Sequence, residues 1–164
     1  MTANDTWFIE HFSHTGSAIG FRTTGKLDEV QSPFQKIEIY DSTDWGKLMV
    51  IDGAMMLTTR DNFFYHEMIS HPVLFTHAAP KRVVIIGGGD CGTLREVLKH
   101  KGVESVTQCD IDEQVTVMAR KGDSSFDFRQ ADSAAKTFNT LYYTAALHTG
   151  VLVTPPFVQA ALKG

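Results

Sequence analysis

A glycine-rich turn directly after a short run of β-branched residues constrains this chain more than any other feature. Residues 83–86 read Val-Val-Ile-Ile, which is typical of a buried strand, and residues 87–90 read Gly-Gly-Gly-Asp. A helical pattern follows over residues 93–99. Because glycine has no Cβ, the backbone of such a turn can approach a ligand closely. The sequence therefore predicts a strand, a ligand-binding turn and a helix, in that order.

The spacing of Gly87, Gly89 and Gly92 fits the dinucleotide fingerprint G-x-G-x-x-G, but Asp90 lies inside it. In dinucleotide-binding proteins the amide N–H groups of this turn hold a pyrophosphate, which a carboxylate would repel. The same turn suits an adenosyl ligand whose tail carries a positive charge. We therefore expect a sulfonium nucleoside as the ligand, in preference to NAD.

The net charge and the cysteine content indicate which kinds of ligand and which cellular compartment suit this chain. The chain has 164 residues, a formal net charge of −4 and two cysteines, Cys91 and Cys109. A net negative charge argues against a nucleic-acid partner and is compatible with a cationic substrate. Two cysteines form no disulfide framework, so a reduced cytoplasmic protein is the simpler interpretation. Residues 1–5 are polar and no apolar run reaches membrane-spanning length, so we expect neither a secretory signal nor a membrane partner.

Residues 19–59 read as short strands separated by turns. The turn signals are Ser-Pro at 32–33, Asp-Trp-Gly at 44–46 and Asp-Gly at 52–53, the last being the strongest hairpin signal. Strand alternation places Gln35 on the same face as Ile37 and Ile39. Its amide either meets solvent or backbone at the strand end or binds a ligand, because a buried unpaired amide costs about 1–3 kcal/mol. Residues 1–60 are expected to form a small antiparallel β domain.

A helix is predicted over residues 63–70, with Asp61 as its N-cap and Pro72 beyond its end. Three adjacent polar side chains fan over about 200° of this helix, namely Tyr65, His66 and Glu67. They cannot all face solvent if the helix packs on a sheet. Structural and functional roles for the tyrosine and the histidine both stay open.

A second strand is predicted over residues 105–109, and Asp110 follows it. This acid lies roughly twenty residues beyond the glycine turn, where a Rossmann-type fold places a carboxylate on the ribose hydroxyls. Asp112 is equally suited to cap the next helix, residues 113–120. We assign Asp110 to the ribose and Asp112 to the cap.

The alternation of strands and helices stops after residue 121. Residues 122–125 read as a turn where a third parallel strand should approach, and a polar stretch, Tyr142-Tyr143 and a short helical segment at 144–148 follow. A doubly wound sheet needs at least about four parallel strands, and this pattern supplies two. Residues 61–164 are therefore expected to form a Rossmann-like domain that is incomplete after about residue 121, with an open strand edge that favours self-association.

These motifs together resemble the spermidine synthase family, the polyamine aminopropyltransferases. The segments that carry the resemblance keep the family's order and are residues 7–8, 32–35, 50–53, 61–68 and 87–98. The match runs from the N-terminus to about residue 120 and resumes in the C-terminal tail, while the family's middle segment is missing. The resemblance implies an α/β fold: a small N-terminal antiparallel β domain followed by a Rossmann-like domain of the methyltransferase type, here truncated.

The family transfers an aminopropyl group from decarboxylated S-adenosylmethionine to putrescine, giving spermidine and methylthioadenosine. By resemblance, the expected partners of this chain are these two substrates and further copies of itself, because family members commonly form homodimers or homotetramers through the N-terminal region. Decarboxylated S-adenosylmethionine is a co-substrate, and the resemblance implies no tightly bound cofactor and no metal.

The resemblance also implies residue roles. Gln35 would bind the nucleoside, Asp110 its ribose, and Asp90 the aminopropyl ammonium group. Tyr65 and His66 would line the polyamine side, with Tyr65 as the catalytic candidate. The full set of nucleoside-binding candidates is Gln35, Gly87, Gly88, Gly89, Asp90 and Asp110. Intact S-adenosylmethionine would bring a carboxylate towards Asp90, so this residue would also select the decarboxylated form.

The chain departs from the family's pattern in several places. An Asp-rich loop that supplies the proton acceptor, and an Asp-Gly pair before it that contacts adenine, are absent. Met56 stands where glutamine is frequent, Asn62 where glutamate is usual, and Cys91 where glycine is usual. A positive φ at Cys91 would strain the turn.

Three hypotheses follow from the sequence. The first is an aminopropyltransferase whose chain lacks its middle third and therefore has little or no activity. The second is a catalytically dead nucleoside-binding or oligomerisation partner. The third is an ordinary methyltransferase or NAD enzyme, and Asp90 counts against both of these.

Overall fold

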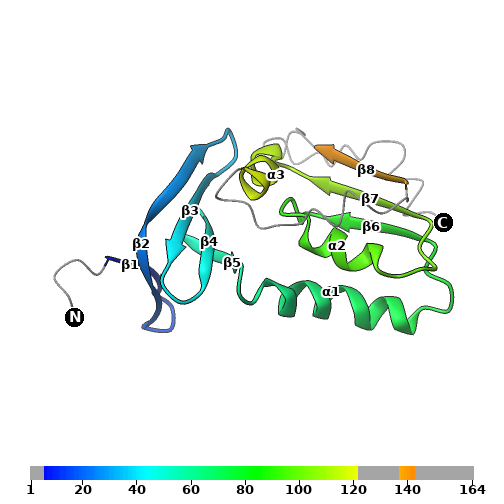
Figure 1. Ribbon diagram of the computed structural model, residues 1–164, viewed down its shortest axis with the longest axis horizontal. Coiled ribbons are helices and arrows are strands. Elements are labelled where there is room, and N and C mark those ends of the chain that lie inside the picture. The colour runs from blue at the N-terminus through cyan, green and yellow to red at the C-terminus, as the bar shows by residue number, and fades with distance from the viewer. Residues whose placement is uncertain (1–5, 122–136, 143–164) are drawn as a thin grey trace.

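A computed structural model of the chain describes residues 6–121 and the backbone of residues 137–142. An antiparallel sheet comes first along the chain and stands at the left of Figure 1. Its strands pair in chain order and are β1 (Thr6–Phe12), β2 (Ser17–Gln31), β3 (Lys36–Ser42), β4 (Gly46–Ile51) and β5 (Ala54–Thr58). The predicted N-terminal antiparallel β region is thereby confirmed.

The Asp-Gly hairpin signal between β4 and β5 is confirmed in detail. Asp52 and Gly53 both have positive φ, at 49° and 79°. A two-residue turn with positive φ at both positions matches the right-handed twist of the strands that it joins.

The rest of the described chain alternates helices and strands (Figure 1). Its elements are α1 (Asn62–Thr76), β6 (Arg82–Ile86), α2 (Gly92–Leu98), β7 (Ser105–Asp110), α3 (Glu113–Arg120) and β8 (Thr137–Tyr142). Strands β6, β7 and β8 form a parallel sheet in that order. This is the α/β, Rossmann-like arrangement that the sequence predicts.

The prediction of only two parallel strands is wrong. β8 pairs with β7 in parallel over its full length, from Thr137 opposite Ser105 to Tyr142 opposite Asp110. Threonine and aromatic residues favour strands, but the long polar stretch before β8 hides it from a search for a buried strand. The predicted helical segment at 144–148 lies outside the described residues.

The first helix of this half, α1, also differs from its prediction. It continues through Pro72 to Thr76, because one missing hydrogen bond does not end a helix whose residues Ser70 and Leu74 are buried. Asp61 occupies the N-cap position, but its side chain makes no capping hydrogen bond and accepts instead from the Thr58 hydroxyl at 2.5 Å.

One buried apolar cluster joins the two sheets. It contains Ile37, Ile39, Met49 and Leu57 from the first sheet together with residues of the α/β half, among them Leu94, Val106, Val115 and Met118. The core therefore continues from β3 and β4 to α2, β7 and α3. The division into domains at 1–60 and 61–164 stays a prediction.

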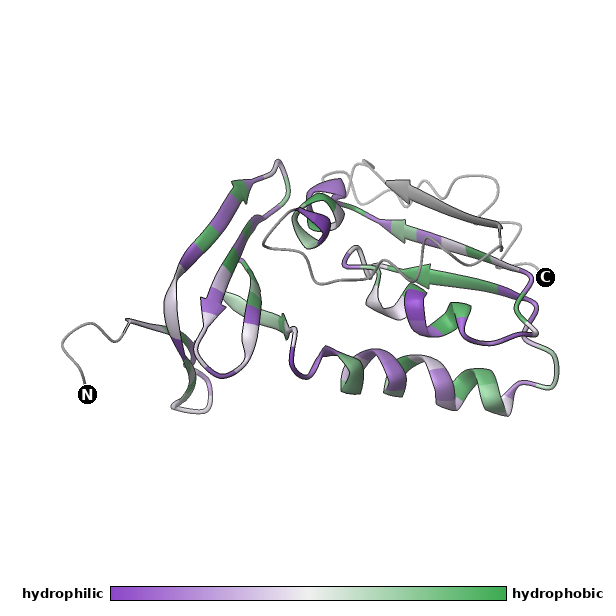
Figure 2. Cartoon of the chain, viewed as in Figure 1, coloured by the Kyte–Doolittle hydropathy of each residue, from purple (hydrophilic) through white to green (hydrophobic). Residues whose placement is uncertain are grey.

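Within the part of the chain that the structure describes, several apolar side chains of α1 and β6 are exposed. Figure 2 shows β6 as largely hydrophobic and α1 as banded with hydrophobic and hydrophilic residues. Within the described residues β6 has a neighbour on one side only, and Ile86 at its end is 82% exposed. None of the described helices has the length and hydropathy needed to cross a membrane. The cytoplasmic location stays a prediction.

Candidate active site

The glycine turn between β6 and α2 uses backbone conformations that favour glycine. Gly87 and Gly88 have φ of 81° and 73°, and Cys91 has φ of 68°. The left-handed region costs a residue with a Cβ about 1–2 kcal/mol, so the strain expected at Cys91 is present. The Cys91 sulfur is buried and lies 3.8 Å from both Gln108 Nε2 and Arg120 Nη2. Packing of this thiol offsets part of the backbone strain.

Gly89 is the point where the turn contacts the end of β7 and the start of α3. Its N–H donates to Asp110 Oδ2 at 2.7 Å, and its carbonyl accepts from the Thr116 hydroxyl at 2.6 Å. A Cβ at Gly89 would lie 2.9 Å from Asp110 Oδ2 and 3.0 Å from Val115 Cβ. Glycine is therefore required here by close approach.

Two carboxylates lie at the end of β7, namely Asp110 as its last residue and Asp112 just beyond it, and they make different contacts. Asp112 caps α3 by accepting from Gln114 N at 2.9 Å, as the sequence predicts. Asp110 accepts from the N–H groups of Gly89 and Asp112, at 2.7 and 3.0 Å, which fixes the direction of its carboxylate. The sequence-based assignment of Asp110 to a ribose stays a prediction.

Gln35 reaches the same region from the segment before β3. Its Nε2 donates to Asp112 Oδ2 at 3.0 Å, and the Ser32 hydroxyl donates to the same oxygen at 2.7 Å. The amide is therefore held by the α3 cap and is not left unpaired on an apolar face. This contact ties the first sheet to the α/β half.

A cavity of about 170 Å³ lies between the first sheet, the glycine turn and the end of β7. Its lining residues are Gln35, Met49, Ile51, Met56, Leu57, Gly88, Gly89, Asp90, Asp110, Ile111 and Val115. Most predicted nucleoside-binding residues are thus brought together, and Gly87 is not among the lining residues. The cavity is smaller than the roughly 300–1,000 Å³ typical of small-molecule sites, so it holds part of such a ligand.

The apolar wall of this cavity was not predicted. Met49, Ile51 and Leu57 come from β4 and β5, and strand alternation in those segments is the signal that could have indicated them. Met56, where the family frequently has glutamine, also lines the cavity and is 55% exposed.

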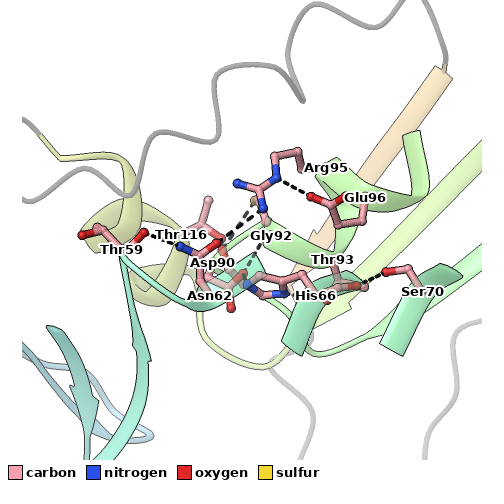
Figure 3. Close-up of polar contacts among 12 residues, drawn as sticks. Thr59, Asn62, His66, Ser70, Asp90, Gly92, Thr93, Arg95, Glu96 and Thr116 are labelled. Carbon is pink, nitrogen blue, oxygen red and sulfur yellow. Dashed lines mark hydrogen bonds and ion pairs between the residues drawn. The ribbon is translucent and has the colours of Figure 1, made fainter. Parts of the chain in front are cut away.

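The half-buried Asp90 of the glycine turn and the buried His66 of α1 form a pair (Figure 3). Asp90 Oδ1 accepts from Gly92 N at 2.6 Å and lies 3.6 Å from His66 Nε2. His66 Nδ1 is 3.1 Å from the Thr93 hydroxyl, and the residue is 1% exposed. A Cβ at Gly92 would lie 2.1 Å from His66 Nε2, so the imidazole occupies the space that glycine leaves.

The two residues predicted for the polyamine side differ in position. His66 is buried, whereas Tyr65 is 64% exposed on α1, with its ring 5.3 Å from the His66 ring. Neither is among the residues that line the cavity. Their roles in polyamine binding and catalysis stay predictions.

Burial controls the ionisation of the Asp90–His66 pair. Burial lowers the pKa of His66, and the nearby Asp90 carboxylate opposes this only in part. Burial also raises the pKa of Asp90, against the favourable effects of His66 and the Gly92 N–H. A cation arriving beside Asp90 would offset the cost of its buried charge, so ligand binding and ionisation of Asp90 are coupled.

Acidification below about pH 6.5 is expected to destabilise the fold through His66. The unfolded chain binds a proton near the ordinary histidine pKa of 6.5, and the folded chain binds it at a lower pH because burial lowers the His66 pKa. Between these values the unfolded state holds more protons, so the free energy of unfolding falls as pH falls. Asp90 acts in the opposite sense, adding stability as pH falls through its raised pKa.

Urea midpoints of the chain and of the His66→Gln variant test this expectation. Between about pH 7.5 and about pH 5.5 the midpoint of the chain should fall, and that of the variant should fall less. Equal decreases in both proteins would assign the effect to other groups and contradict the prediction.

Comparisons with known proteins match both halves of the chain. A family model described as "Spermidine synthase tetramerisation domain" matches residues 6–59, and one described as "Spermine/spermidine synthase domain" matches residues 62–143. The polyamine aminopropyltransferase of Stenotrophomonas maltophilia (strain K279a) is 51% identical over 283 residues, covering 99% of this chain and 100% of that protein. The chain belongs to the spermidine synthase family.

Other spermidine synthase relatives show how much of the family's length is present. The polyamine aminopropyltransferase of Xylella fastidiosa (strain M23) is 85% identical over 121 residues, which are 74% of this chain and 42% of that protein. The crystal structure of spermidine synthase from Thermotoga maritima has a TM-score of 0.76 and 36% identity, covering 84% of this chain and 47% of that one. A spermidine synthase in complex with the transition state analogue AdoDATO matches equally well over 46% of its length.

The chain thus spans less than half the length of the solved spermidine synthases that it matches. The alignment over 283 residues is also much longer than the 164 residues of the chain. Both findings agree with the expected absence of the family's middle segment.

Proposed function

We propose that this chain carries the nucleoside-binding part of an enzyme that transfers an aminopropyl group from decarboxylated S-adenosylmethionine to putrescine. The products are spermidine and methylthioadenosine. The observation that carries the proposal is the cavity with Asp90 and Asp110 in one wall. One carboxylate suits the ribose and the other suits the cationic tail of the same ligand.

The fixed carboxylate of Asp110 supports the ribose assignment. Two backbone N–H groups orient it, and its remaining lone pairs can accept from the two ribose hydroxyls. Gln35 lies beside it in the cavity wall, held by Asp112. The apolar residues from β4 and β5 suit the flat face of a base and a methylthio group.

Asp90 supports the choice of the decarboxylated nucleoside. An ammonium group near it gains a charge-assisted hydrogen bond, and the carboxylate of intact S-adenosylmethionine is repelled. Two unit charges 4 Å apart interact by about 1 kcal/mol in water and by about 4 kcal/mol at the effective dielectric constant near a protein surface. Since each 1.4 kcal/mol is about tenfold in affinity, one carboxylate gives useful discrimination.

The reaction needs a neutral amine as its nucleophile. Tyr65 on α1 is the candidate for contact with this amine. The ring of Tyr65 contacts the ring of His66, and His66 in turn lies next to Asp90. The family's proton-acceptor aspartate has no counterpart in this sequence. Since a general base contributes about 10²–10⁴ in rate, transfer by this chain should be slower by about that factor than in a complete relative.

The N-terminal sheet is the proposed site of homodimer or homotetramer formation. It coincides with residues 6–59, which match the tetramerisation domain of the family. Large apolar side chains are exposed on β1 and β2, namely Trp7, Ile9, Phe12, Ile19 and Leu27. Contact between copies would remove this apolar surface from water.

Calorimetry and a methylthioadenosine assay test the proposed function together. The chain should bind decarboxylated S-adenosylmethionine at least about tenfold more tightly than S-adenosylmethionine, and it should release methylthioadenosine slowly and only with putrescine present. Tighter binding of S-adenosylmethionine or NAD would refute the proposal. Failure of a cooperatively folded chain to bind the decarboxylated nucleoside would refute it too.

A further inference from the structure

Away from the cavity, α1 and α2 bring three ligand-type side chains together. Glu67 and His71 come from α1, and Glu96 comes from α2. One donor atom from each lies within 4.8 Å of the donor atoms of the other two. Glu67 and His71 are four residues apart, so they share one face of the helix.

Glu96 is a fully buried carboxylate at the centre of this group. Its Oε1 accepts from Arg95 Nε at 2.7 Å. Its Oε2 forms an ion pair with the Lys99 ammonium group and lies 3.3 Å from His71 Nε2. A buried anion is therefore aimed between the two helices.

His71 is oriented by a second histidine. Its Nδ1 lies 2.9 Å from His100 Nε2, which directs its Nε2 towards Glu96. Histidines that bind metals through one ring nitrogen commonly have the other nitrogen held by a hydrogen bond in this way. His71 Nε2 and the buried Glu96 Oε2 therefore lie close enough together to bind the same ion.

We propose that Glu67, His71 and Glu96 bind one divalent cation of the zinc class. Zinc forms bonds of about 2.0–2.2 Å to nitrogen and oxygen, which places tetrahedral ligand atoms about 3.3–3.6 Å apart. The separation of 3.3 Å between His71 Nε2 and Glu96 Oε2 already meets this requirement. The Glu67 carboxylate, whose donor atom lies within 4.8 Å of the other two, would move closer to complete the set, and water would take the fourth position.

Binding of the cation requires Lys99 to leave Glu96. The Lys99 side chain is 50% exposed, so its ammonium group can withdraw into water. The cation would then connect α1, which carries His66, to α2, which begins at Gly92. It would stabilise α1, which carries His66, and α2, which begins two residues after Asp90, without touching the nucleoside cavity.

Zinc titration of the untagged chain, after treatment with a chelator, tests this site. Calorimetry should show one zinc ion bound per chain, and zinc should raise the thermal midpoint. The Glu67→Gln and His71→Gln variants should each weaken binding by about tenfold or more, because each removes one ligand. Glu104→Gln is the matched control, since Glu104 is exposed and pairs with Lys81, and it should bind zinc like the parent chain.

The variants also distinguish zinc binding at the proposed site from zinc binding at other histidines of the chain. Glu67→Gln retains every histidine and replaces a half-buried side chain by one of nearly equal size, so its fold should persist, which the thermal midpoint without zinc would verify. Absence of zinc binding by the parent chain would overturn the proposal. Zinc affinity unchanged in both Glu67→Gln and His71→Gln would overturn it as well, because the ion would then lie elsewhere.

Discussion

The Asp90→Asn variant is expected to bind decarboxylated S-adenosylmethionine about ten- to a hundredfold more weakly, with binding of methylthioadenosine changed by less than about twofold. The first ligand carries an ammonium group, whereas the second has lost the aminopropyl tail. A hydrogen bond to a charged group contributes about 1.5–3 kcal/mol, and asparagine removes the charge. The asparagine side chain keeps an oxygen that can accept from Gly92 N, so the turn should remain folded.

Asp110→Asn is the matched comparison for this experiment. Asp110 is proposed to bind the ribose, which both ligands contain, so this variant should weaken both ligands to a similar extent. Calorimetric titration of each protein with each ligand gives the four affinities. Equal weakening of both ligands in Asp90→Asn would show that Asp90 does not face the aminopropyl tail.

The Gly92→Ala variant is expected to lower the free energy of unfolding by about 3 kcal/mol, the upper end of the usual cost of overpacking. The added methyl group would lie 2.1 Å from Nε2 and 2.3 Å from Cδ2 of His66. This ring is buried and held at Thr93, so it cannot rotate into solvent. The gain in helix propensity from glycine to alanine, about 1 kcal/mol, offsets only part of the clash.

Chemical denaturation of the Gly102→Ala and His66→Ala variants and of the His66→Ala/Gly92→Ala double variant completes this test. Gly102→Ala should be nearly neutral, because nothing lies within 4 Å of a Cβ at that position. In the His66→Ala/Gly92→Ala double variant the two changes should be non-additive by about 1–3 kcal/mol relative to the single variants, since removal of the ring makes room for the methyl group. An unchanged stability of Gly92→Ala, or strict additivity, would contradict the packing of His66 against Gly92.

Several elements could be predicted because their signals lie close together in the sequence. The Asp-Gly hairpin depends on two residues with positive φ, and the α3 cap depends on Asp112 and an N–H two residues later. The strand before the glycine turn and the helix after it follow from short patterns of apolar residues. The spacing of Asp110 after the glycine turn and the charge of Asp90 within it predict their roles, and the family resemblance implies the same roles, which stay predictions.

Other features could not be predicted because they depend on which surfaces pack together. The continuation of α1 through Pro72 rests on burial of residues on both sides of it. Pairing of β8 with β7 is non-local, since the backbone partners Ser105 and Thr137 are far apart in the chain. Neither has a local sequence signal.

The sequence by itself determined the strand, ligand-binding turn, helix, strand and helix of residues 82–120 and the two carboxylates near that turn, since backbone preferences and caps act over a few residues. Tertiary structure alone decided that the Gln35 amide is held by Asp112, 77 residues away, and that the His66 ring fills the space over Gly92. The physical reason is that such contacts arise when distant surfaces pack, and the energies of packing do not appear in local spacing.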